Sequence, residues 1–214
     1  MYGDKQKHYI ESHGNGAGIL YLVEEDNPSR RYFILGKSVH KHEWEIPGGK
    51  QDPDDPSIIY TAARESVEEF GLQPKFHKKI VDFITKYPIS VSIYHPKGVY
   101  VLYVVKLKSF DFKKANSAAK FRLQVFDILD YYGQSELRTL VEMSEYGKIN
   151  MWEYLAGKEN NLDGFTIRER DMCLLHLDEL INKVYYVSRN EKFPMFEEPF
   201  EFINFDEIID GEEA

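Results

Sequence analysis

The sequence has little of what a secreted or membrane protein carries. It contains one cysteine, Cys173, in 214 residues, which excludes an internal disulfide framework. No apolar run is long enough to cross a membrane, and residues 1–15 lack the apolar core of a signal peptide. Acidic residues outnumber basic ones by 36 to 27, so the net charge of −9 argues against a broad nucleic-acid surface. We therefore expect a cytoplasmic protein with neither a membrane nor a nucleic acid as its partner.

The composition does supply a core, because 43% of the residues are hydrophobic and 14% of all residues are aromatic. This amount suits one folded domain, which we predict over residues 1–189. Residues 190–214 form an acidic tail with five phenylalanines, an unusual number for a disordered segment. We expect the first half of this tail to pack on the domain.

The order of sequence patterns predicts an α/β fold in which a mixed sheet lies between helices. Short apolar runs predict strands at 18–23, 32–36, 80–87, 99–108 and 149–154. The run at 99–108 is nearly continuous in Val, Leu and Tyr, which is typical of a strand covered on both faces. Apolar residues at helical spacing predict a long C-terminal helix at 165–186 and two helices at 115–132 and 135–143. These two would form a helical insertion at 109–143, which could shape a ligand pocket or a homodimer contact.

One further helix carries a cluster of like charges. Glu65, Glu68 and Glu69 follow Arg64 at positions i, i+3 and i+4, so they share one helical face. Like charges repel each other, and a hard divalent cation neutralises them most readily. Mg²⁺ prefers carboxylate oxygens and usually keeps bound waters and substrate phosphates in its shell. We therefore predict a Mg²⁺ site on this face, which Mn²⁺ would also fit.

A glycine turn and an acidic loop precede this helix. Residues 47–50, Pro-Gly-Gly-Lys, predict a tight turn, and Asp-Pro-Asp-Asp follows at 52–55. Asp55 before Pro56 is typical of a helix N-cap followed by the first helical residue. Gly71 fits a left-handed cap at the other end. The expected order is strand, turn, acidic loop and helix.

From Gly49 to Leu72 the chain resembles the Nudix box, G-x5-E-x7-R-E-U-x-E-E-x-G-U, with U a bulky apolar residue. The family consists of hydrolases that act on nucleoside diphosphates linked to another moiety. The match departs from the pattern in its first half, where Asp55 replaces the first glutamate. Eight residues instead of seven then separate Asp55 from Arg64, and Ser66 stands where the family usually has an aliphatic residue.

The resemblance implies a role for each box residue. Asp55 would support Arg64, and Arg64 would orient the catalytic loop. The three glutamates would bind the metal, and the backbone carbonyl of Gly48 would complete its shell. The reaction also needs a general base, which is either a box glutamate or a glutamate from a later loop. The predicted catalytic residues are Arg64, Glu65, Glu69, Glu142 and Glu145, the last two because they precede the strand expected at 149–154.

The resemblance also implies a substrate class. It predicts cleavage of the diphosphate bridge in a small nucleotide, either ADP-ribose or a nucleotide sugar. Dinucleoside polyphosphates and capped RNA are the alternative substrates, and a nucleotide-sensing module without activity is the non-enzymatic alternative. Retention of all three glutamates argues for the enzyme. Four residues are predicted to contact the substrate: Phe33, Trp44, Lys50 and Tyr87.

Overall fold

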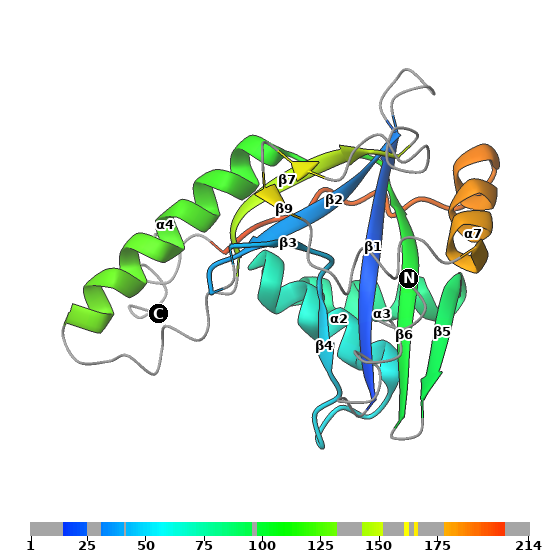
Figure 1. Cartoon of the computed structure of the whole chain (residues 1–214), viewed down its shortest axis with the longest axis horizontal. Helices are drawn as coiled ribbons and strands as arrows, with labels where there is room; N and C mark the ends of the chain where they lie inside the picture. The colour runs from blue at the N-terminus through cyan, green and yellow to red at the C-terminus, as the bar shows by residue number, and fades with distance from the viewer. Residues whose placement is uncertain are drawn as a thin grey trace.

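A mixed sheet forms the centre of the described fold (Figure 1). The computed structural model describes residues 15–24, 31–40, 42–95, 98–131, 143–151, 161–162, 165–166 and 178–203. In these ranges the sheet has seven strands: β1 Gly16–Glu24, β2 Arg31–Ser38, β3 Trp44–Glu45, β4 Gly48–Lys50, β5 Ser90–His95, β6 Gly98–Leu107 and β7 Met143–Asn150. The helices are α2 Ile58–Phe70, α3 Lys75–Lys86, α4 Phe112–Tyr131 and α7 Asp178–Arg189. A small separate sheet pairs β8 Asn161–Leu162 with β9 Phe165–Thr166.

The sheet combines parallel and antiparallel pairs. Its main path runs β3-β2-β1-β6-β5, while β4 pairs with β1 and β7 pairs with β2. Strands β1 and β6 are parallel and adjacent, and the other pairs are antiparallel. The predicted α/β class with a mixed sheet is therefore confirmed.

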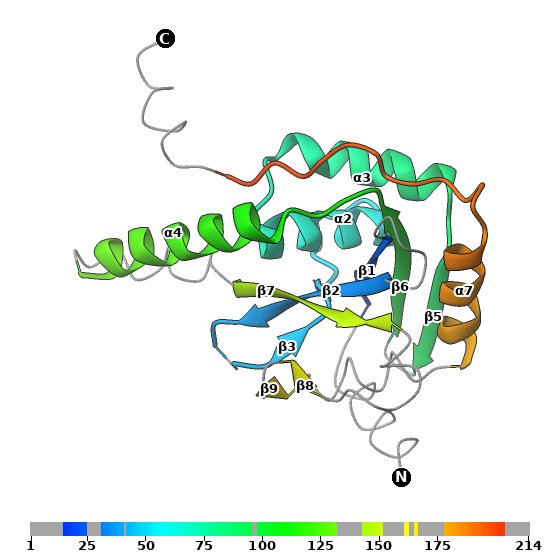
Figure 2. The same ribbon diagram turned by 90° about the horizontal axis from the view of Figure 1, so that it is seen from above.

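Side chains of β1 alternate between two buried clusters, one on each face of the sheet. Ile19 and Tyr21 lie in the cluster that also contains residues of α2 and α3. Leu20 and Leu22 lie in the cluster that contains residues of α7. The sheet is therefore covered by helices on both sides, and α4 projects away from it (Figure 1, Figure 2).

Several predicted elements are confirmed. The strands expected at 18–23, 32–36 and 99–108 are β1, β2 and β6, and the helix expected at 115–132 is α4. Strand β6 is buried along most of its length between β1 and β5, as its continuous apolar run predicts. Its position explains why its sequence shows no alternation of polar and apolar residues.

Other element predictions are wrong. The strand expected at 80–87 is the second half of α3, whose buried residues Phe76, Ile80 and Ile84 recur at i, i+4 and i+8. The helix expected at 165–186 cannot begin at 165, because Phe165–Thr166 is strand β9, and its described part is α7, Asp178–Arg189. The strand expected at 149–154 begins earlier, at Met143, and ends at Asn150. Of the helix expected at 135–143, all but Met143 lies outside the described residues, as does Cys173.

The segment 190–203, which we call the strap, packs across α3 after the end of α7 (Figure 2). Phe196 forms backbone hydrogen bonds with Lys106 and Lys108 at the end of β6. Glu198 and Glu201 of the strap form ion pairs with lysines of α3. The prediction that the first half of the tail packs on the domain is therefore confirmed for the described residues.

The strap also accounts for a basic cluster near the start of α3. Lys75 pairs with Glu201 at 2.5 Å, and Lys79 pairs with Glu198. His77 contacts the ring of Tyr60 at a centroid distance of 4.0 Å. These side chains therefore hold the strap and the adjoining helix together.

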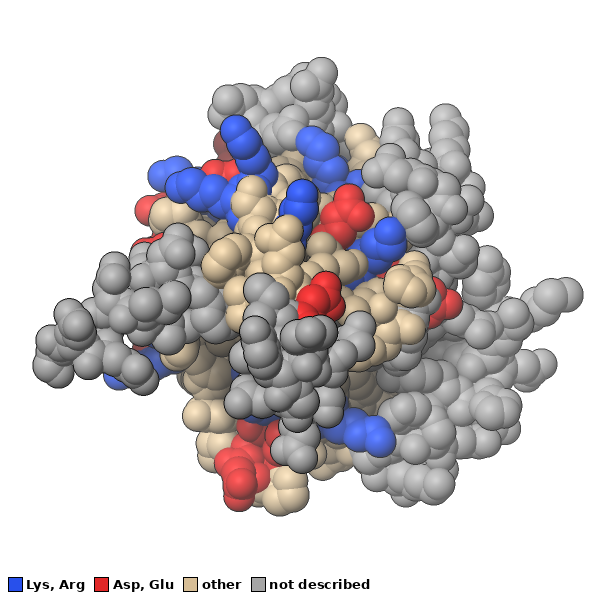
Figure 3. All heavy atoms as spheres, turned by 90° about the vertical axis from the view of Figure 1, so that its left-hand side faces the viewer, with Lys and Arg blue, Asp and Glu red and all other residues tan. Residues whose placement is uncertain are grey.

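Charged side chains of both signs lie together on the surface toward which α4 projects (Figure 3). Lys and Arg gather in the upper part of that view, with acidic side chains between them. No helix in the described ranges is both long and apolar enough to cross a membrane.

Candidate active site

The glycine turn lies directly against two carboxylates of α2. Strand β4 begins at Gly48, which pairs with Gly18 of β1. The backbone N–H of Gly48 donates to Oε2 of Glu69 at 2.7 Å. A Cβ atom on Gly49 would lie 2.5 Å from the carboxylate of Glu65. Only glycine therefore lets the turn approach the helix this closely.

The ends of α2 are set by local residues. Ser57 is the N-cap, and its hydroxyl accepts from the N–H of Tyr60 at 3.3 Å. The predicted cap Asp55 is therefore wrong, because its carboxylate is already bound by Arg64 and by the N–H of Asp52. Gly71 ends the helix with φ 59° and ψ 45°, as predicted for a left-handed cap.

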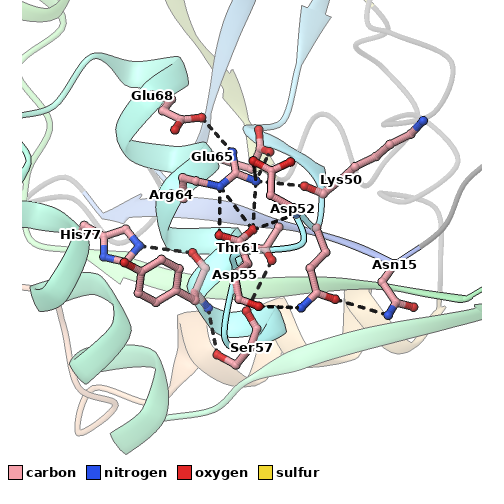
Figure 4. A network of polar contacts seen from close by, with 12 residues as sticks. Asn15, Lys50, Asp52, Asp55, Ser57, Thr61, Arg64, Glu65, Glu68 and His77 are labelled. Carbon is pink, nitrogen blue, oxygen red and sulfur yellow. Dashed lines mark hydrogen bonds and ion pairs between the residues drawn. The ribbon is translucent and has the colours of Figure 1, made fainter.

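Arg64 is the centre of the polar network beside the turn (Figure 4). Its Nε and Nη2 both donate to the carboxylate of Asp55, at 3.1 and 3.0 Å. Nη2 also donates to the carbonyl of Lys50 at 3.0 Å and lies 2.9 Å from Glu65. Nη1 donates to Glu68 at 2.9 Å. One guanidinium thus connects the turn, the acidic loop and two of the three glutamates.

The charges in this network shift each other's proton affinity. Burial raises the pKa of Asp55, but hydrogen bonds from Arg64, the Asp52 N–H and Thr61 outweigh it, so the pKa is lowered overall. Burial likewise lowers the pKa of Arg64, while Asp55, Glu65 and Glu68 raise it further than burial lowers it. Asp55 is therefore ionised and Arg64 charged at neutral pH.

The three glutamates differ in their surroundings. The side chain of Glu65 is 12% exposed and that of Glu68 is 53% exposed, while Glu69 is buried against the turn. Their mutual repulsion is already reduced, because Arg64 pairs with two of them and Gly48 donates to the third. We expected a metal ion to be what neutralises this face, but the protein's own groups partly do so.

The same residues suit a divalent cation. Carboxylate and carbonyl oxygens are the ligands that Mg²⁺ and Mn²⁺ prefer. Glu65, Glu69 and the backbone of Gly48 already meet at the turn. Within the described ranges, no group of three or more His, Cys, Asp or Glu side chains is already arranged around one metal position. A metal here would therefore have to replace Arg64 as the partner of Glu65 and Glu68, while Arg64 kept Asp55 and the Lys50 carbonyl.

Comparison with known proteins agrees with this geometry. A family model described as the NUDIX domain matches residues 12–131, more than half of the chain. The chain belongs to the Nudix family.

Two relatives are similar over short stretches. Mitochondrial coenzyme A diphosphatase NUDT8 of Mus musculus is 59% identical over 39 residues, which cover 18% of this chain and 19% of the relative. Nudix hydrolase 15, mitochondrial, of Arabidopsis thaliana is 36% identical over 73 residues, covering 32% of this chain and 24% of the relative. The chain thus spans a quarter or less of the length of either relative.

Two solved structures are similar to this chain at low sequence identity. The NUDIX domain of Shewanella oneidensis NrtR, complexed with ADP ribose, has a TM-score of 0.42 and 11% identity, covering 84% of this chain and 90% of that one. A C. elegans Ap4A hydrolase in a binary complex has a TM-score of 0.38 and 12% identity, covering 81% of this chain and 96% of that one.

The unusual Ser66 of the Nudix box has a partner in the sheet. Its hydroxyl and that of Tyr21 on β1 lie 2.5 Å apart, and both residues are fully buried. Burial raises the pKa of Tyr21, and the hydrogen bond to Ser66 only partly offsets this, so the phenol stays protonated. A small polar residue therefore fits here because it satisfies a buried hydroxyl that an aliphatic residue would leave without a partner.

The predicted substrate residues do not gather around the Nudix box. Lys50 belongs to the turn, but its side chain extends away from the acidic cluster (Figure 4). Phe33 and Trp44 are each 1% exposed and pack in the core on the face opposite α2. Tyr87 follows the last turn of α3, where it contacts Phe83 and Lys86. Neither Phe33 nor Trp44 offers a ring face to a ligand in this arrangement, because both side chains are buried.

Glu142 and Glu145, which follow the Nudix box in the sequence, were the predicted candidates for the general base. Glu142 lies outside the described residues. Glu145 is not in a loop but inside β7, opposite Lys37 of β2, and the two side chains form an ion pair at 3.8 Å. Its neighbour Tyr146 stacks on Phe70 of α2, so Glu145 points to the opposite face of the sheet. The strand therefore turns the Glu145 carboxylate away from the Nudix box.

Sequence reasoning missed the residues that hold the far end of α2. Arg122 of α4 donates to the hydroxyl of Tyr146 at 2.8 Å, and that hydroxyl donates to the carbonyl of Glu69 at 3.0 Å. These residues lie dozens of positions from the box, and neither belongs to a motif. The single available signal was an arginine among apolar residues in the predicted insertion.

Proposed function

We propose that this protein is a divalent-metal-dependent hydrolase that cleaves the diphosphate bridge of a nucleotide linked to another group. The observation that carries this proposal is the contact of the glycine turn with Glu65 and Glu69, while Arg64 joins the turn to the acidic loop. These contacts form only if the glycine turn and acidic loop of the first half of the box lie next to the helix of its second half. They therefore support an intact Nudix box, despite the aspartate and the extra residue in its first half.

Each box residue then has a definite task. Glu65, Glu68, Glu69 and the carbonyl of Gly48 would hold Mg²⁺ or Mn²⁺. The bound ion would screen the anionic diphosphate and lower the pKa of a water that attacks phosphorus. Arg64 keeps the turn in place through the Lys50 carbonyl and does not need to touch the substrate. The hydrogen bonds from Arg64 to Asp55 would hold the guanidinium in place when the glutamates bind a metal ion instead of Arg64.

The general base is the least constrained part of this mechanism. Glu145 faces away from the box, and among the described glutamates this favours Glu65 as the proton acceptor. Its carboxylate lies beside Gly49 and forms an ion pair with Arg64. If Glu65 accepts the proton, Glu68 and Glu69 are the main metal ligands. Glu142 stays the second candidate.

The substrate class follows from shared chemistry. ADP-ribose and nucleotide sugars, our first expectation, each have a diphosphate bridge between a nucleoside and an organic group. Coenzyme A, named for the mouse relative, has such a bridge as well. We propose that the substrate belongs to this class of diphosphate-bridged nucleotides. The short stretch matched by the mouse relative makes coenzyme A a candidate beside ADP-ribose.

The test is hydrolysis of a substrate panel with Mg²⁺ or Mn²⁺. The panel contains ADP-ribose, a nucleotide sugar, coenzyme A, a diadenosine polyphosphate, a nucleoside triphosphate and capped RNA. We expect two phosphorylated products from a diphosphate-bridged substrate, loss of turnover in Glu69→Gln, and normal turnover in Glu197→Gln, which changes an exposed strap residue. A nucleotide that raises the melting temperature but stays intact would instead indicate a sensing module. Phosphate release from a monophosphate would contradict the proposed chemistry.

A further inference from the structure

The last turn of α2 carries Glu68 and Glu69, and its backbone carbonyls have no partners within the helix. The cap satisfies the first two, since Leu72 donates to Val67 and Gly71 donates to Glu68. The next two, and the carbonyl of the cap residue Gly71, are satisfied by distant segments: Glu69 by the hydroxyl of Tyr146 at 3.0 Å, Phe70 by Arg122 at 3.3 Å and Gly71 by the N–H of Ile203 at 2.8 Å. Strand β7, helix α4 and the strap thus complete a helix end that would otherwise lack partners.

The direction of each hydrogen bond at Tyr146 is determined. A guanidinium can only donate, so the Tyr146 hydroxyl accepts from Arg122. Its own proton is therefore directed at the carbonyl of Glu69. Burial raises the pKa of Tyr146 more than the charge of Arg122 lowers it, which keeps this proton in place at neutral pH. The chain Arg122–Tyr146–Glu69 has one arrangement of donors and acceptors.

Arg122 is an unusual residue to find here. It is 5% exposed, and its described hydrogen bonds go to the carbonyl of Phe70 and the hydroxyl of Tyr146. A buried cation without a carboxylate partner is costly in general. It is favoured at this point because the C-terminus of a helix carries a partial negative charge. A Cβ atom on Gly71 would lie 1.2 Å from Nη1 of Arg122, so the guanidinium fills the space that this glycine leaves.

Tyr146 is itself held from two sides. The side chain of Asn116 accepts from the Tyr146 N–H at 2.6 Å and donates to its carbonyl at 3.1 Å. The Tyr146 ring stacks on Phe70, with centroids 5.0 Å apart and planes 18° apart. Asn116 and Arg122 both come from α4, the insertion whose role the sequence left open. The first part of α4 therefore fixes both the backbone and the hydroxyl of Tyr146.

We propose that Tyr146, held by Asn116 and Arg122 of α4, is a positioning residue that fixes the last turn of α2 and so places Glu68 and Glu69 for metal binding. This role rests on the proposed function. Removing the hydroxyl takes the Tyr146 hydrogen bond from the Glu69 carbonyl, so the turn relaxes toward other conformations. Changes to residues that orient metal ligands typically lower metal affinity or activity about 10- to 100-fold.

The test compares Tyr146→Phe, which keeps the stacked ring, with Tyr103→Phe. Tyr103 is a buried tyrosine of the same core cluster, and among the described contacts no hydrogen bond joins its hydroxyl to α2. Mn²⁺ affinity is measured by electron paramagnetic resonance of the free ion, without substrate. We expect Tyr146→Phe to weaken Mn²⁺ binding roughly 10-fold and to lower kcat more than it changes KM. Tyr103→Phe should change neither quantity.

Arg122→Lys provides a second variant and a coupling test. It should weaken Mn²⁺ binding in the same direction, and the double variant should lose less than the sum of the single losses, because both act through one hydrogen-bonded chain. Melting temperatures establish that each variant is folded. Unchanged Mn²⁺ affinity in both folded variants, or an equal loss in Tyr103→Phe, would overturn the positioning role.

Glu69→Gln separates this inference from the function on which it rests. If Glu69→Gln weakens Mn²⁺ binding and Tyr146→Phe does not, the metal site stands and the positioning role is overturned. If Glu69→Gln leaves Mn²⁺ binding unchanged, the metal assignment fails, and the positioning role fails with it.

Discussion

Asp55 binds Arg64 through two nitrogens, with Oδ1 accepting from Nε at 3.1 Å and Oδ2 from Nη2 at 3.0 Å. This is the contact expected of the first glutamate in the Nudix box. The aspartate side chain is one methylene shorter, and the chain between the two residues is one residue longer. In this loop the carboxylate nevertheless reaches the guanidinium, so the interaction is made despite the departure from the pattern.

Asp55→Asn should destabilise the fold and lower activity. An amide can accept one of the two hydrogen bonds but brings a second donor toward the guanidinium, and it removes a nearly buried charge beside Arg64. A hydrogen bond to a charged group contributes about 1.5–3 kcal/mol, so we expect a loss of that order in the free energy of unfolding by urea. Asp54→Asn is the matched control, because Asp54 is exposed in the same loop. Equal stability of both variants would contradict the role of Asp55.

The same contact predicts how stability changes with pH. The folded-state pKa of Asp55 is lowered, whereas the unfolded value is about 3.9. A carboxyl group with a depressed pKa contributes stability that is present above the unfolded pKa and lost as pH falls through the folded one. The stability difference between wild type and Asp55→Asn should therefore be constant from neutral pH down to about pH 5 and shrink below about pH 4. Urea titrations of both proteins across this pH range measure this difference in the free energy of unfolding. A difference that grew as the pH fell would contradict the prediction.

Glu68→Gln and Glu69→Gln should both abolish most hydrolysis but differ in stability. Glu68 is exposed, and its ion pair with Arg64 contributes at most about 1 kcal/mol, so Glu68→Gln should unfold close to wild type. Glu69 is buried and accepts from Gly48, so its variant should be the less stable of the two without metal. Calorimetry in a chelating buffer measures this difference. Near-normal activity in either variant would contradict the metal assignment.

Glu65→Gln and Glu145→Gln test the general base as a pair. A base near the attacking water contributes about 10² to 10⁴ in rate, so we expect kcat of Glu65→Gln to fall by that order. Glu145→Gln should keep kcat, because the carboxylate lies on the other face of the sheet and pairs with Lys37. A parallel Mn²⁺ titration distinguishes loss of a base from loss of a ligand. Loss of activity in Glu145→Gln with a normal melting temperature would restore our first assignment.

Ser66→Ala should destabilise the protein through Tyr21. The change leaves a buried hydroxyl without its partner, which costs about 1–3 kcal/mol. Adding Tyr21→Phe removes that hydroxyl, so the double variant should regain part of the lost stability. The coupling energy from a double-mutant cycle in urea is the measurement. Additive losses would show that the 2.5 Å contact does not contribute to stability.

The patterns that the sequence predicted correctly are mostly local. The left-handed cap at Gly71, the apolar run of β6 and the helix α4 depend on residues close in the chain, so spacing and backbone preference reveal them. Local patterns also misled, since the apolar residues of 80–87 suit a strand until Phe76 shows their helical period. The resemblance to the Nudix family, and not a local pattern, predicted that Asp55 supports Arg64.

Tertiary structure decided what surrounds the box. Whether Glu145 faces α2 depends on how β7 pairs with β2, and a shift of one residue would reverse it. Whether Trp44 meets a ligand or the core depends on which face of the sheet it joins. The Arg122–Tyr146–Glu69 chain joins three elements far apart in the sequence, and no spacing rule relates them. By itself the sequence determined the charged groups available for chemistry, because their types and local spacing are written in it. Packing decided which of these groups meet, because burial and hydrogen bonding between distant segments exist only in the folded chain.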